Sequence, residues 1–354
     1  MTALGARIAA RIAATGPITL ADYMAECLLD PDHGYYATRD PFGRAGDFTT
    51  APEISQMFGE LLGLSLAQAW LDQGSPDGFT LAELGPGRGT LMADVLRATR
   101  AVPGFRAAAR VMLVEASATL RGIQRQSLAG HVVQWRDTAA DLPDAPLFLL
   151  ANEFFDALPI RQFTRTGQGW AETMVGVEGG KLALGRGPAL PLGFLAHRLA
   201  DTVEGDVVEH CPAAPGIMAE LGQRIARHGG AAIIVDYGDW GSRGDTFQAL
   251  QDHRFAHPLA APGAADLTAH VDFRALAQAA APAKASRMIP QGVLLNRLGI
   301  ETRSARLAKG LTGTALQSHL AATRRLTDPG EMGSLFKALA LYPDPASPPP
   351  GFDP

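Results

Sequence analysis

The fold class of this 354-residue chain is decided by the stretch Thr80-Leu-Ala-Glu-Leu-Gly-Pro-Gly-Arg-Gly-Thr-Leu91. An apolar segment, which we expect to be a strand, runs into glycines at positions 85, 87 and 89 and then into a helix. Glycine has no Cβ, so the backbone can turn tightly there and approach a ligand that a side chain would block. This order of strand, glycine-rich turn and helix is typical of the cofactor loop of a parallel α/β sheet.

The loop is compatible with three interpretations: a turn without a ligand, a dinucleotide site, or a site for S-adenosylmethionine. Its glycine spacing is GxGxG, preceded by Glu83, whereas dinucleotide folds use GxGxxG. A pyrophosphate favours helix-end amides without a carboxylate nearby, but the cationic ammonium group of S-adenosylmethionine is compatible with Glu83. The loop therefore favours the methyl donor over NAD, and the expected cofactor contacts within it are Glu83, Gly85, Pro86, Gly87 and Gly89.

Acidic residues follow the next two predicted strands. Residues 110–115 end in Glu115, at a position where a carboxylate can accept hydrogen bonds from both ribose hydroxyls of a nucleoside. Asp137 comes just after the strand predicted at 131–135, where it could meet an adenine amino group, although a solvated loop aspartate fits the pattern equally well. We expect both residues to contribute to the cofactor site.

The segment after the fourth predicted strand carries the candidate catalytic groups. In Leu150-Ala-Asn-Glu-Phe-Phe-Asp-Ala-Leu-Pro159, an amide and two carboxylates follow the strand at the carboxyl edge of the sheet, where ligands bind in this architecture. Carboxylates beside aromatic rings can orient a guanidinium and remove a proton from it. We take Glu153 and Asp156 as candidate catalytic residues and Asn152 as a cofactor contact. The alternative is a helix N-terminus that Asn152 caps, with the acids next to the helix dipole.

Three further patches belong to the same edge if the sheet is doubly wound. Gly46-Asp-Phe-Thr-Thr-Ala-Pro-Glu-Ile-Ser55 has the pattern of a loop followed by a capped helix and could equally be only that, and Asp236-Tyr-Gly238 ends the fifth strand. Asp266-Leu-Thr-Ala-His-Val-Asp272 contains His270, which could act as a base near neutral pH, although a lone histidine is more often a structural polar group. The first patch adds three candidate cofactor contacts: Asp47, Thr50 and Pro52.

The order of the predicted elements indicates an α/β fold, a doubly wound Rossmann-like sheet with an inserted β-meander and helical additions. Strand and helix patterns alternate from Phe79 onward, change to a glycine-punctuated polar–apolar alternation over 161–190, and then resume. Residues 332–341 are expected to form a closing strand. The expected divisions are residues 1–78 (N-terminal helices and active-site loop), 79–160 (cofactor half of the core), 161–214 (β-rich insertion), 215–341 (second half of the core, with a helical insertion at about 272–325) and 342–354 (flexible, proline-rich tail).

Composition argues against several partner classes. The net charge is −5 and no run of Lys or Arg forms a stripe that could follow a phosphate backbone, so nucleic acid is not expected as a partner. The longest apolar stretches are shorter than the roughly 20 residues that a membrane helix needs, so no membrane insertion is expected. Cys27 and Cys211 lie far apart without CxxC or histidine-rich neighbours, which favours a reducing compartment and neither disulfides nor a metal site. We interpret residues 1–16 as the first helix rather than an import presequence.

Several longer motifs occur in order along nearly the whole chain. They are Gly-Pro-Ile-Thr at 16–19, Gly46-Asp-Phe-Thr-Thr-Ala-Pro-Glu53 with Phe58-Gly-Glu-Leu61, Glu83-Leu-Gly-Pro-Gly-Arg-Gly-Thr90, Val114-Glu-Ala-Ser117, Ala151-Asn-Glu-Phe-Phe-Asp-Ala-Leu-Pro159, Asp236-Tyr-Gly238, Ala265-Asp-Leu-Thr-Ala-His-Val-Asp-Phe273 and Met332-Gly-Ser-Leu-Phe-Lys337. Together they resemble the MidA-like family of S-adenosylmethionine-dependent methyltransferases. The resemblance implies a methyltransferase core with an added domain. It also implies that the Asp47 loop and the loop from Asn152 to Asp156 close over the reacting centre.

The resemblance further implies an arginine side chain of a protein as the methyl acceptor, because the family includes the mitochondrial protein-arginine methyltransferase that acts in complex I assembly. A catalytic-core subunit of respiratory complex I is therefore the expected partner, and the catalytic candidates are Glu153, Asp156 and His270. The paired-glutamate loop of better-known arginine methyltransferases is absent. A small-molecule methyltransferase and a non-catalytic assembly chaperone remain alternatives. The expected location is the bacterial cytoplasm, or the mitochondrial matrix for a eukaryotic source.

Overall fold

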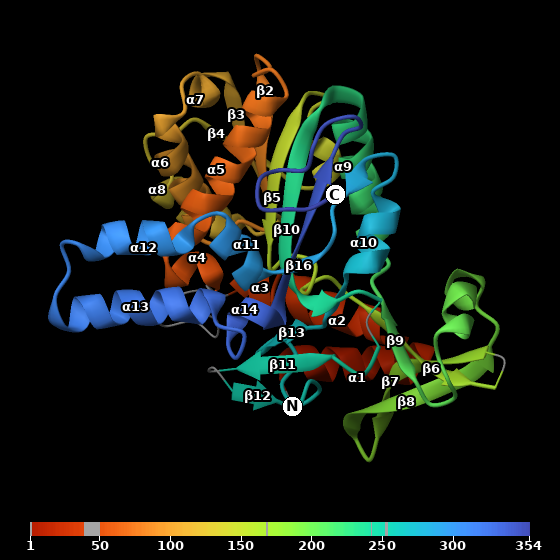
Figure 1. The fold of residues 1–354 in the computed structure, drawn as a ribbon. Helices are drawn as coiled ribbons and strands as arrows, with labels where there is room; N and C mark the ends of the chain where they lie inside the picture. Colours follow the sequence, from red (N-terminus) through yellow and green to blue (C-terminus); the bar gives the residue numbers. More distant parts are fainter. Residues whose placement is uncertain (1, 39–49, 168, 242, 252–253) are drawn as a thin grey trace.

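The structure, a computed structural model, describes residues 2–38, 50–167, 169–241, 243–251 and 254–354. A mixed sheet forms its centre (Figure 1), in the order β15 (Lys284–Ala285), β17 (Phe336–Tyr342), β10 (Gly230–Asp239), β5 (Leu147–Asn152), β2 (Phe79–Leu84), β3 (Ala109–Val114) and β4 (Val133–Arg136). From β10 to β4 the strands are parallel, and β17 runs antiparallel to β10. The predicted α/β class with a Rossmann-like sheet is confirmed.

Helices cover both faces of this sheet, which explains the continuous apolar sequence of its central strands. Along β5, Phe148 and Leu150 join one core cluster, whereas Leu149 and Ala151 join the other. The first cluster contains residues of α5 (Gln56–Asp72) and α6 (Thr90–Ala98), and the second contains residues of α9 (Ala214–His228) and α10 (Phe273–Ala279), on opposite sides of the sheet in Figure 1. The chain passes from β2 outward to β4 and returns to β5, so a ligand crevice is expected at the carboxyl ends of β2 and β5.

The glycine-punctuated segment forms the predicted antiparallel meander. It consists of β6 (Arg161–Thr166), β7 (Gly169–Glu178) and β8 (Lys181–Leu190), and β9 (Val207–His210) pairs with β6. The N-terminal strand β1 (Ile18–Thr19) also joins this sheet, antiparallel to β7. The sequence did not suggest this pairing, because a two-residue strand has no period.

The N-terminal segment contains the helix predicted for residues 1–16 and a second helix after it. Thr2 caps α1 (Ala3–Thr15), and Thr19 forms a capping box with Asp22 at the start of α2 (Leu20–Leu29). Among the described helices, none combines the length and the apolar character that crossing a membrane requires. The remaining elements before residue 290 are α3 (Tyr35–Thr38), α4 (Ala51–Ile54), η1 (Thr99–Ala101), α7 (Phe105–Ala108), α8 (Ala118–Ser127), η2 (Ala139–Asp141), η3 (Gly193–Ala200), β11 (Gln248–Gln251), β12 (Arg254–Ala256), β13 (Asp266–Thr268), β14 (Val271–Asp272) and β16 (Ile289–Pro290).

The C-terminal part departs from expectation at two places. Residues 332–341 were expected to be one strand, but a short helix, α14 (Met332–Leu335), precedes β17. The proline-rich end was expected to be flexible, yet Phe352 is only 8% exposed and belongs to the core cluster of α5 and α6. Ser65 Oγ also donates a hydrogen bond to the carbonyl of Pro350 at 2.8 Å. Burial of Phe352 and hydrogen bonds from Ser65 and Arg297 therefore hold a segment whose composition alone indicates disorder. The helical insertion expected at about 272–325 is present and contains, after α10, the helices α11 (Gln291–Arg297), α12 (Ile300–Ala308) and α13 (Gly313–Thr327).

Two glycines of α9 give a matched test of how closely this helix packs on α10. A Cβ on Gly222 would lie 1.8 Å from the carbonyl oxygen of Ala280, whereas a Cβ on Gly216 would meet no atom within 4 Å. We therefore expect Gly222→Ala to lower the free energy of unfolding by about 3 kcal/mol through overpacking. Gly216→Ala is expected to raise it by about 0.5–1 kcal/mol, because alanine favours the helix. Urea denaturation of both variants checks this; equal stabilities would contradict the packing described.

Candidate functional site

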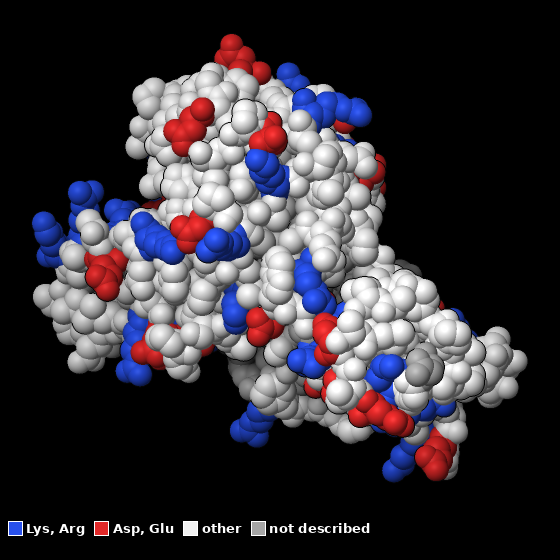
Figure 2. Space-filling view, turned by 45° about the vertical axis from the view of Figure 1, so that its right-hand side comes forward, with Lys and Arg blue, Asp and Glu red and all other residues white. Residues whose placement is uncertain are grey.

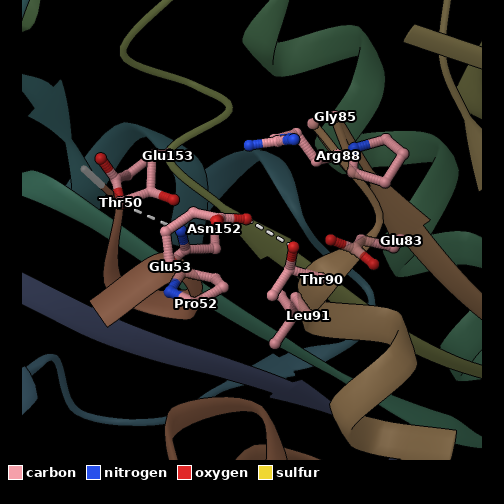
Figure 3. A pocket seen from close by; sticks show the side chains of 12 residues that line it. Thr50, Pro52, Glu53, Glu83, Gly85, Arg88, Thr90, Leu91, Asn152 and Glu153 are labelled. Carbon is pink, nitrogen blue, oxygen red and sulfur yellow. Dashed lines mark hydrogen bonds between the residues drawn. The ribbon is translucent and has the colours of Figure 1, made fainter. Parts of the chain in front are cut away.

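A pocket opens at the carboxyl ends of β2 and β5, where the strand order changes direction (Figure 3). Three segments form it: the glycine loop after β2, the turn after β5, and the start of α4. The lining residues are Thr50, Pro52, Glu53, Glu83, Gly85, Pro86, Gly87, Arg88, Thr90, Leu91, Asn152 and Glu153. Seven of the residues predicted from the sequence are thus brought together: Glu83, Gly85, Pro86, Gly87, Asn152, Thr50 and Pro52, with Glu153 beside them.

The glycines of the loop are required by close packing as well as by the pocket. Gly85 has φ +59°, and a Cβ on it would lie 2.8 Å from the ring of Phe154, which belongs to the turn after β5. Gly89 has φ +82° and precedes α6; it does not line the pocket, and a Cβ there would contact Leu128 and Gln124 at 3.5–3.6 Å. The left-handed conformation of both residues favours glycine. A side chain at position 85 would therefore clash with Phe154 of the protein itself, in addition to the ligand that the sequence analysis considered.

Glu83 is a buried carboxyl group at the base of the pocket. Glu83 is the next-to-last residue of β2 and is only 3% exposed. Burial raises the pKa of Glu83 to about 8, and the neighbouring carboxyl groups of Glu115 and Asp94 add to this rise. Its Oε2 has no hydrogen-bond donor among the described residues, and the same holds for the buried Oδ1 of Asn152. Two buried acceptors without donors are costly to a protein unless a ligand supplies the donors.

These two acceptors fit the α-ammonium group of S-adenosylmethionine. An ammonium ion is a cation with three N–H donors and no acceptor. It can satisfy the orphaned oxygens of Glu83 and Asn152, and the charge of Glu83 is then compensated. This pair of acceptors therefore suits the methyl donor better than the pyrophosphate of a dinucleotide, which would place negative charge beside a carboxylate.

Glu153 lies at the opposite side of the pocket from Glu83 (Figure 3). Its backbone has φ +51°, a left-handed conformation that is strained for a residue with a Cβ. Its Oε1 accepts hydrogen bonds from Asn152 Nδ2 at 3.1 Å and from the backbone N–H of Ala51 at 3.3 Å. Burial, and then the neighbouring carboxyl group of Asp156, raises the pKa of Glu153 to about 7. The group is therefore held in place and changes protonation near neutral pH.

Asp236 on β10 holds the turn that presents Glu153. Its Oδ2 accepts hydrogen bonds from three successive backbone N–H groups, those of residues 154, 155 and 156, at 3.0–3.3 Å, and its Oδ1 accepts one from Tyr237 at 3.0 Å. The alternative interpretation of this segment, a helix capped by Asn152, is wrong: no helix follows β5. The convergent N–H groups are instead satisfied by a carboxylate from the neighbouring strand.

Removal of the Asp236 carboxylate should strongly destabilise the protein. We expect Asp236→Ala to lower the free energy of unfolding by at least about 3 kcal/mol, because four buried N–H groups lose their acceptor. Asp239→Ala is the matched control, since Asp239 ends the same strand but is exposed and accepts one bond, from Trp240; we expect a change within about 1 kcal/mol. Guanidinium denaturation of both variants measures the difference. A small effect at Asp236 would show that the turn is held by other contacts.

The two acids expected to face the nucleoside lie beside the pocket rather than in its lining. Glu115 is buried, and its Oε1 and Oε2 accept hydrogen bonds from Ser117 N at 2.8 Å and Gln124 Nε2 at 3.2 Å. Gln124 also donates to the carbonyl of Gly87 at 2.8 Å, so it ties Glu115 to the glycine loop. Asp137 is exposed and forms an ion pair with Arg121 at 2.5 Å.

The remaining predicted residues lie elsewhere. Asp156 is buried and does not line the pocket; burial raises its pKa to about 6, and a hydrogen bond from Tyr237 opposes this rise. The ring of His270 packs edge-on against that of Tyr237, with 5.4 Å between the ring centroids. Burial lowers the pKa of His270, and the positive charge of Lys337 lowers it further. It too lies outside the lining. Asp47 lies outside the described residues.

Four lining residues were not predicted: Glu53, Arg88, Thr90 and Leu91. Thr90 Oγ1 donates a hydrogen bond to the carboxylate of Glu53, which joins the first turn of α6 to α4 (Figure 3). Glu53 could have been predicted from the sequence, because it directly follows the predicted residues Thr50 and Pro52. What the sequence could not show is that α4 packs beside the glycine loop.

Comparison with known proteins shows the family to which the chain belongs. The model of a family of S-adenosyl-L-methionine-dependent methyltransferases matches residues 61–291. The chain is 40% identical to the human mitochondrial protein arginine methyltransferase NDUFAF7, over 94% of this chain and 82% of the relative. It is 36% identical to the mitochondrial NDUFAF7 homolog of Drosophila melanogaster, over 96% of this chain and 85% of the relative.

A solved structure supports the same assignment. The crystal structure of a COG1565 superfamily member from Burkholderia thailandensis, bound to S-adenosyl-homocysteine, matches with a TM-score of 0.84 and 31% identity. The match covers 99% of this chain and 93% of that one. The pocket at the carboxyl ends of β2 and β5 thus belongs to a fold that binds the product of methyl transfer in a relative. With its buried acceptors and its glycine loop, the chain belongs to this family of S-adenosylmethionine-dependent methyltransferases.

Proposed function

We propose that the chain methylates an arginine side-chain nitrogen of a protein, with a core subunit of respiratory complex I as the candidate partner. The relatives that are named protein arginine methyltransferases support arginine as the acceptor. The observation that carries the proposal is Glu153, a strained, half-buried carboxyl group in the pocket lining whose pKa is raised to about 7. The free thiols of Cys27 and Cys211 support a reducing location such as the bacterial cytoplasm.

The charge of the pocket suits a cationic acceptor. Three carboxyl side chains, those of Glu53, Glu83 and Glu153, face one arginine, Arg88, in the lining. A bound cation lowers the raised pKa values of Glu83 and Glu153, so that their carboxylates and that of Glu53 give the lining an excess of negative charge. The lining therefore attracts both a guanidinium group and the positively charged methyl donor.

The two ends of the pocket serve different steps in this proposal. S-adenosylmethionine supplies an electrophilic methyl group when bound, and Glu83 and Asn152 would hold its ammonium group. Transfer forms a bond between the arginine nitrogen and the methyl carbon and breaks the carbon–sulfur bond. The nitrogen gives its proton to Glu153, since a base whose pKa lies near the working pH accepts a proton most effectively.

Hydrogen bonds to Glu153 support this assignment. Asn152 Nδ2 and Ala51 N both donate to Oε1, which fixes the orientation of the carboxyl group, and no described donor bonds Oε2. A fixed carboxylate with one oxygen available can orient a guanidinium N–H. Asp156 and His270 lie outside the lining, so we assign the proton to Glu153 and a positioning role to Asp156 through Tyr237.

The experiment is to incubate the protein and methyl-labelled S-adenosylmethionine with an extract of its own host that lacks the gene. Mass spectrometry then locates the label, and Glu153→Gln serves as the inactive control. We expect label on an arginine of one protein. Label on a small molecule would contradict the proposed acceptor. No label, in an assay where other methyltransferases are active, would favour a chaperone that retains the cofactor fold.

A further inference from the structure

A helical hairpin of unusual charge projects from the body of the protein. We call residues 300–327, which comprise α12 and α13, the basic arm. In Figure 1 it extends to the left, on the opposite side of the molecule from β7 and β8. The chain carries a net charge of −5 and the arm +4, so the rest carries −9. The charged residues of the arm are Arg303, Arg306, Lys309, Arg324, Arg325 and Glu301.

Packing in the core does not explain the outer helix of the arm. Over its 15 residues, α13 buries only Leu326, and Leu320 is 51% exposed. A helix of this length on a globular protein normally buries an apolar stripe against the core. Lys and Arg side chains gather instead at the left of the molecule in Figure 2, where the arm lies. The arm therefore presents its surface outward.

The arm is fixed beside the pocket. Arg303 donates two hydrogen bonds, of 2.7 and 2.9 Å, to the buried carboxylate of Glu60 on α5. At its other end α13 contacts α4, the helix that contributes Pro52 and Glu53 to the lining. The charge of Arg325 also lowers the pKa of Glu153, against the larger effect of burial. The positive field of the arm thus reaches the reacting end of the pocket.

We propose that the basic arm docks an acidic surface next to the target arginine of a protein substrate. Arg306, Lys309 and Arg325 form no ion pair within the described part of the chain, whereas Arg324 pairs with Asp328 and Glu331 at 3.3–3.5 Å. A negative pocket beside a positive arm is complementary to an arginine flanked by acidic residues. This inference rests on the proposed function and names the surface class of its substrate.

The docked partner is a protein rather than a nucleic acid. Binding along a phosphate backbone needs a track of many cations. The arm offers three unpaired ones on a chain whose remainder carries −9. A short acidic patch on a folded protein matches this number of cations, and treatment of the extract with nuclease should leave the labelling unchanged.

The test compares two double variants with equal charge change. Arg306→Glu with Lys309→Glu reverses two exposed cations of the arm, and Lys181→Glu with Arg186→Glu reverses two exposed cations of β8. Each protein methylates limiting amounts of the host extract that lacks the gene, at low and high salt. We expect the arm variant to label its protein target at least about tenfold more slowly at low salt, and salt to slow the wild type similarly. The β8 variant should match the wild type.

Two measurements keep the outcomes distinct. The affinity for S-adenosylhomocysteine, measured by calorimetry, should be unchanged in both variants, which shows that the arm variant is folded. Arg306→Gln with Lys309→Gln should give an intermediate rate. Equal labelling by the arm and β8 variants would overturn the docking role and leave the proposed function intact, whereas absence of protein label with the wild type would contradict both.

Discussion

Replacement of Glu83 by glutamine is expected to weaken cofactor binding about a hundredfold while stabilising the ligand-free protein. Removing one partner of a buried charge pair costs about 3 kcal/mol of binding free energy. The stabilisation follows from the pKa of Glu83, which burial raises from 4.5 to about 8. An acid whose pKa is higher in the folded state contributes stability below pH 4.5, and that stability is lost as pH rises through about 8. Glutamine carries no such charge.

The stability change should therefore depend on pH. We expect Glu83→Gln to raise the free energy of unfolding on the order of 2–4 kcal/mol at pH 8.5 and by less than about 1 kcal/mol at pH 5. Urea denaturation at both pH values and calorimetry with S-adenosylhomocysteine measure the two effects. Glu209→Gln is the control, because Glu209 is also a carboxyl group whose pKa burial raises, but lies on β9, outside the lining. Unchanged affinity in Glu83→Gln would contradict the assignment of the ammonium site.

Replacement of Glu153 by glutamine is expected to lower kcat by about 10²- to 10⁴-fold, the usual contribution of a general base. Glutamine keeps the size of the side chain and an oxygen that can accept from Asn152 and Ala51, but it cannot take a proton. Cofactor affinity should stay within about threefold of wild type, because Glu83 and Asn152 are intact. Single-turnover kinetics with the identified protein substrate measures the rate. A variant with near-normal kcat would show that another group accepts the proton.

The pH dependence provides an independent check on the same residue. Only ionised Glu153 can accept a proton, and its pKa is about 7. At saturating S-adenosylmethionine, which keeps Glu83 ionised and paired, kcat/KM for the protein substrate should therefore rise tenfold per pH unit below about 7 and level off above it. In Glu153→Gln this inflection should be absent. A profile that is flat between pH 5.5 and 8.5 in the wild type would contradict a base role for Glu153.

The core of the fold could be predicted from the sequence because its signals are local. The apolar run of β2, the glycines after it and the alternation of strands with capped helices each act over a few residues. The errors arose where distant contacts decide the structure. Phe352 anchors the proline-rich end in a core built from α5 and α6, and the two residues of β1 find their partner only at β7, more than 150 positions away.

The candidate site likewise combines residues that local sequence patterns predict with residues that only distant contacts bring together. The residues of the glycine loop and of the turn after β5 could be predicted, because strand ends meet at one edge of a parallel sheet. The role of Asp236 could not, since only the register of β10 against β5 places its carboxylate under the N–H groups of the turn. Glu53 was missed because its contact with Thr90 joins helices 37 residues apart. Asp156, chemically as suitable as Glu153, follows in the same turn but is not part of the lining.

The central claim is that two carboxyl groups in one pocket have separate tasks: Glu83 holds the methyl donor and Glu153 takes the proton of the acceptor. A crystal structure of the protein with S-adenosylhomocysteine tests it most directly. We predict that the amino group of the ligand lies within hydrogen-bond distance of Glu83 and Asn152, and that Glu153 makes no hydrogen bond to the ligand and borders the open space beside its sulfur. A ligand amino or ribose group bonded to Glu153, with Glu83 left without a partner, would contradict the account.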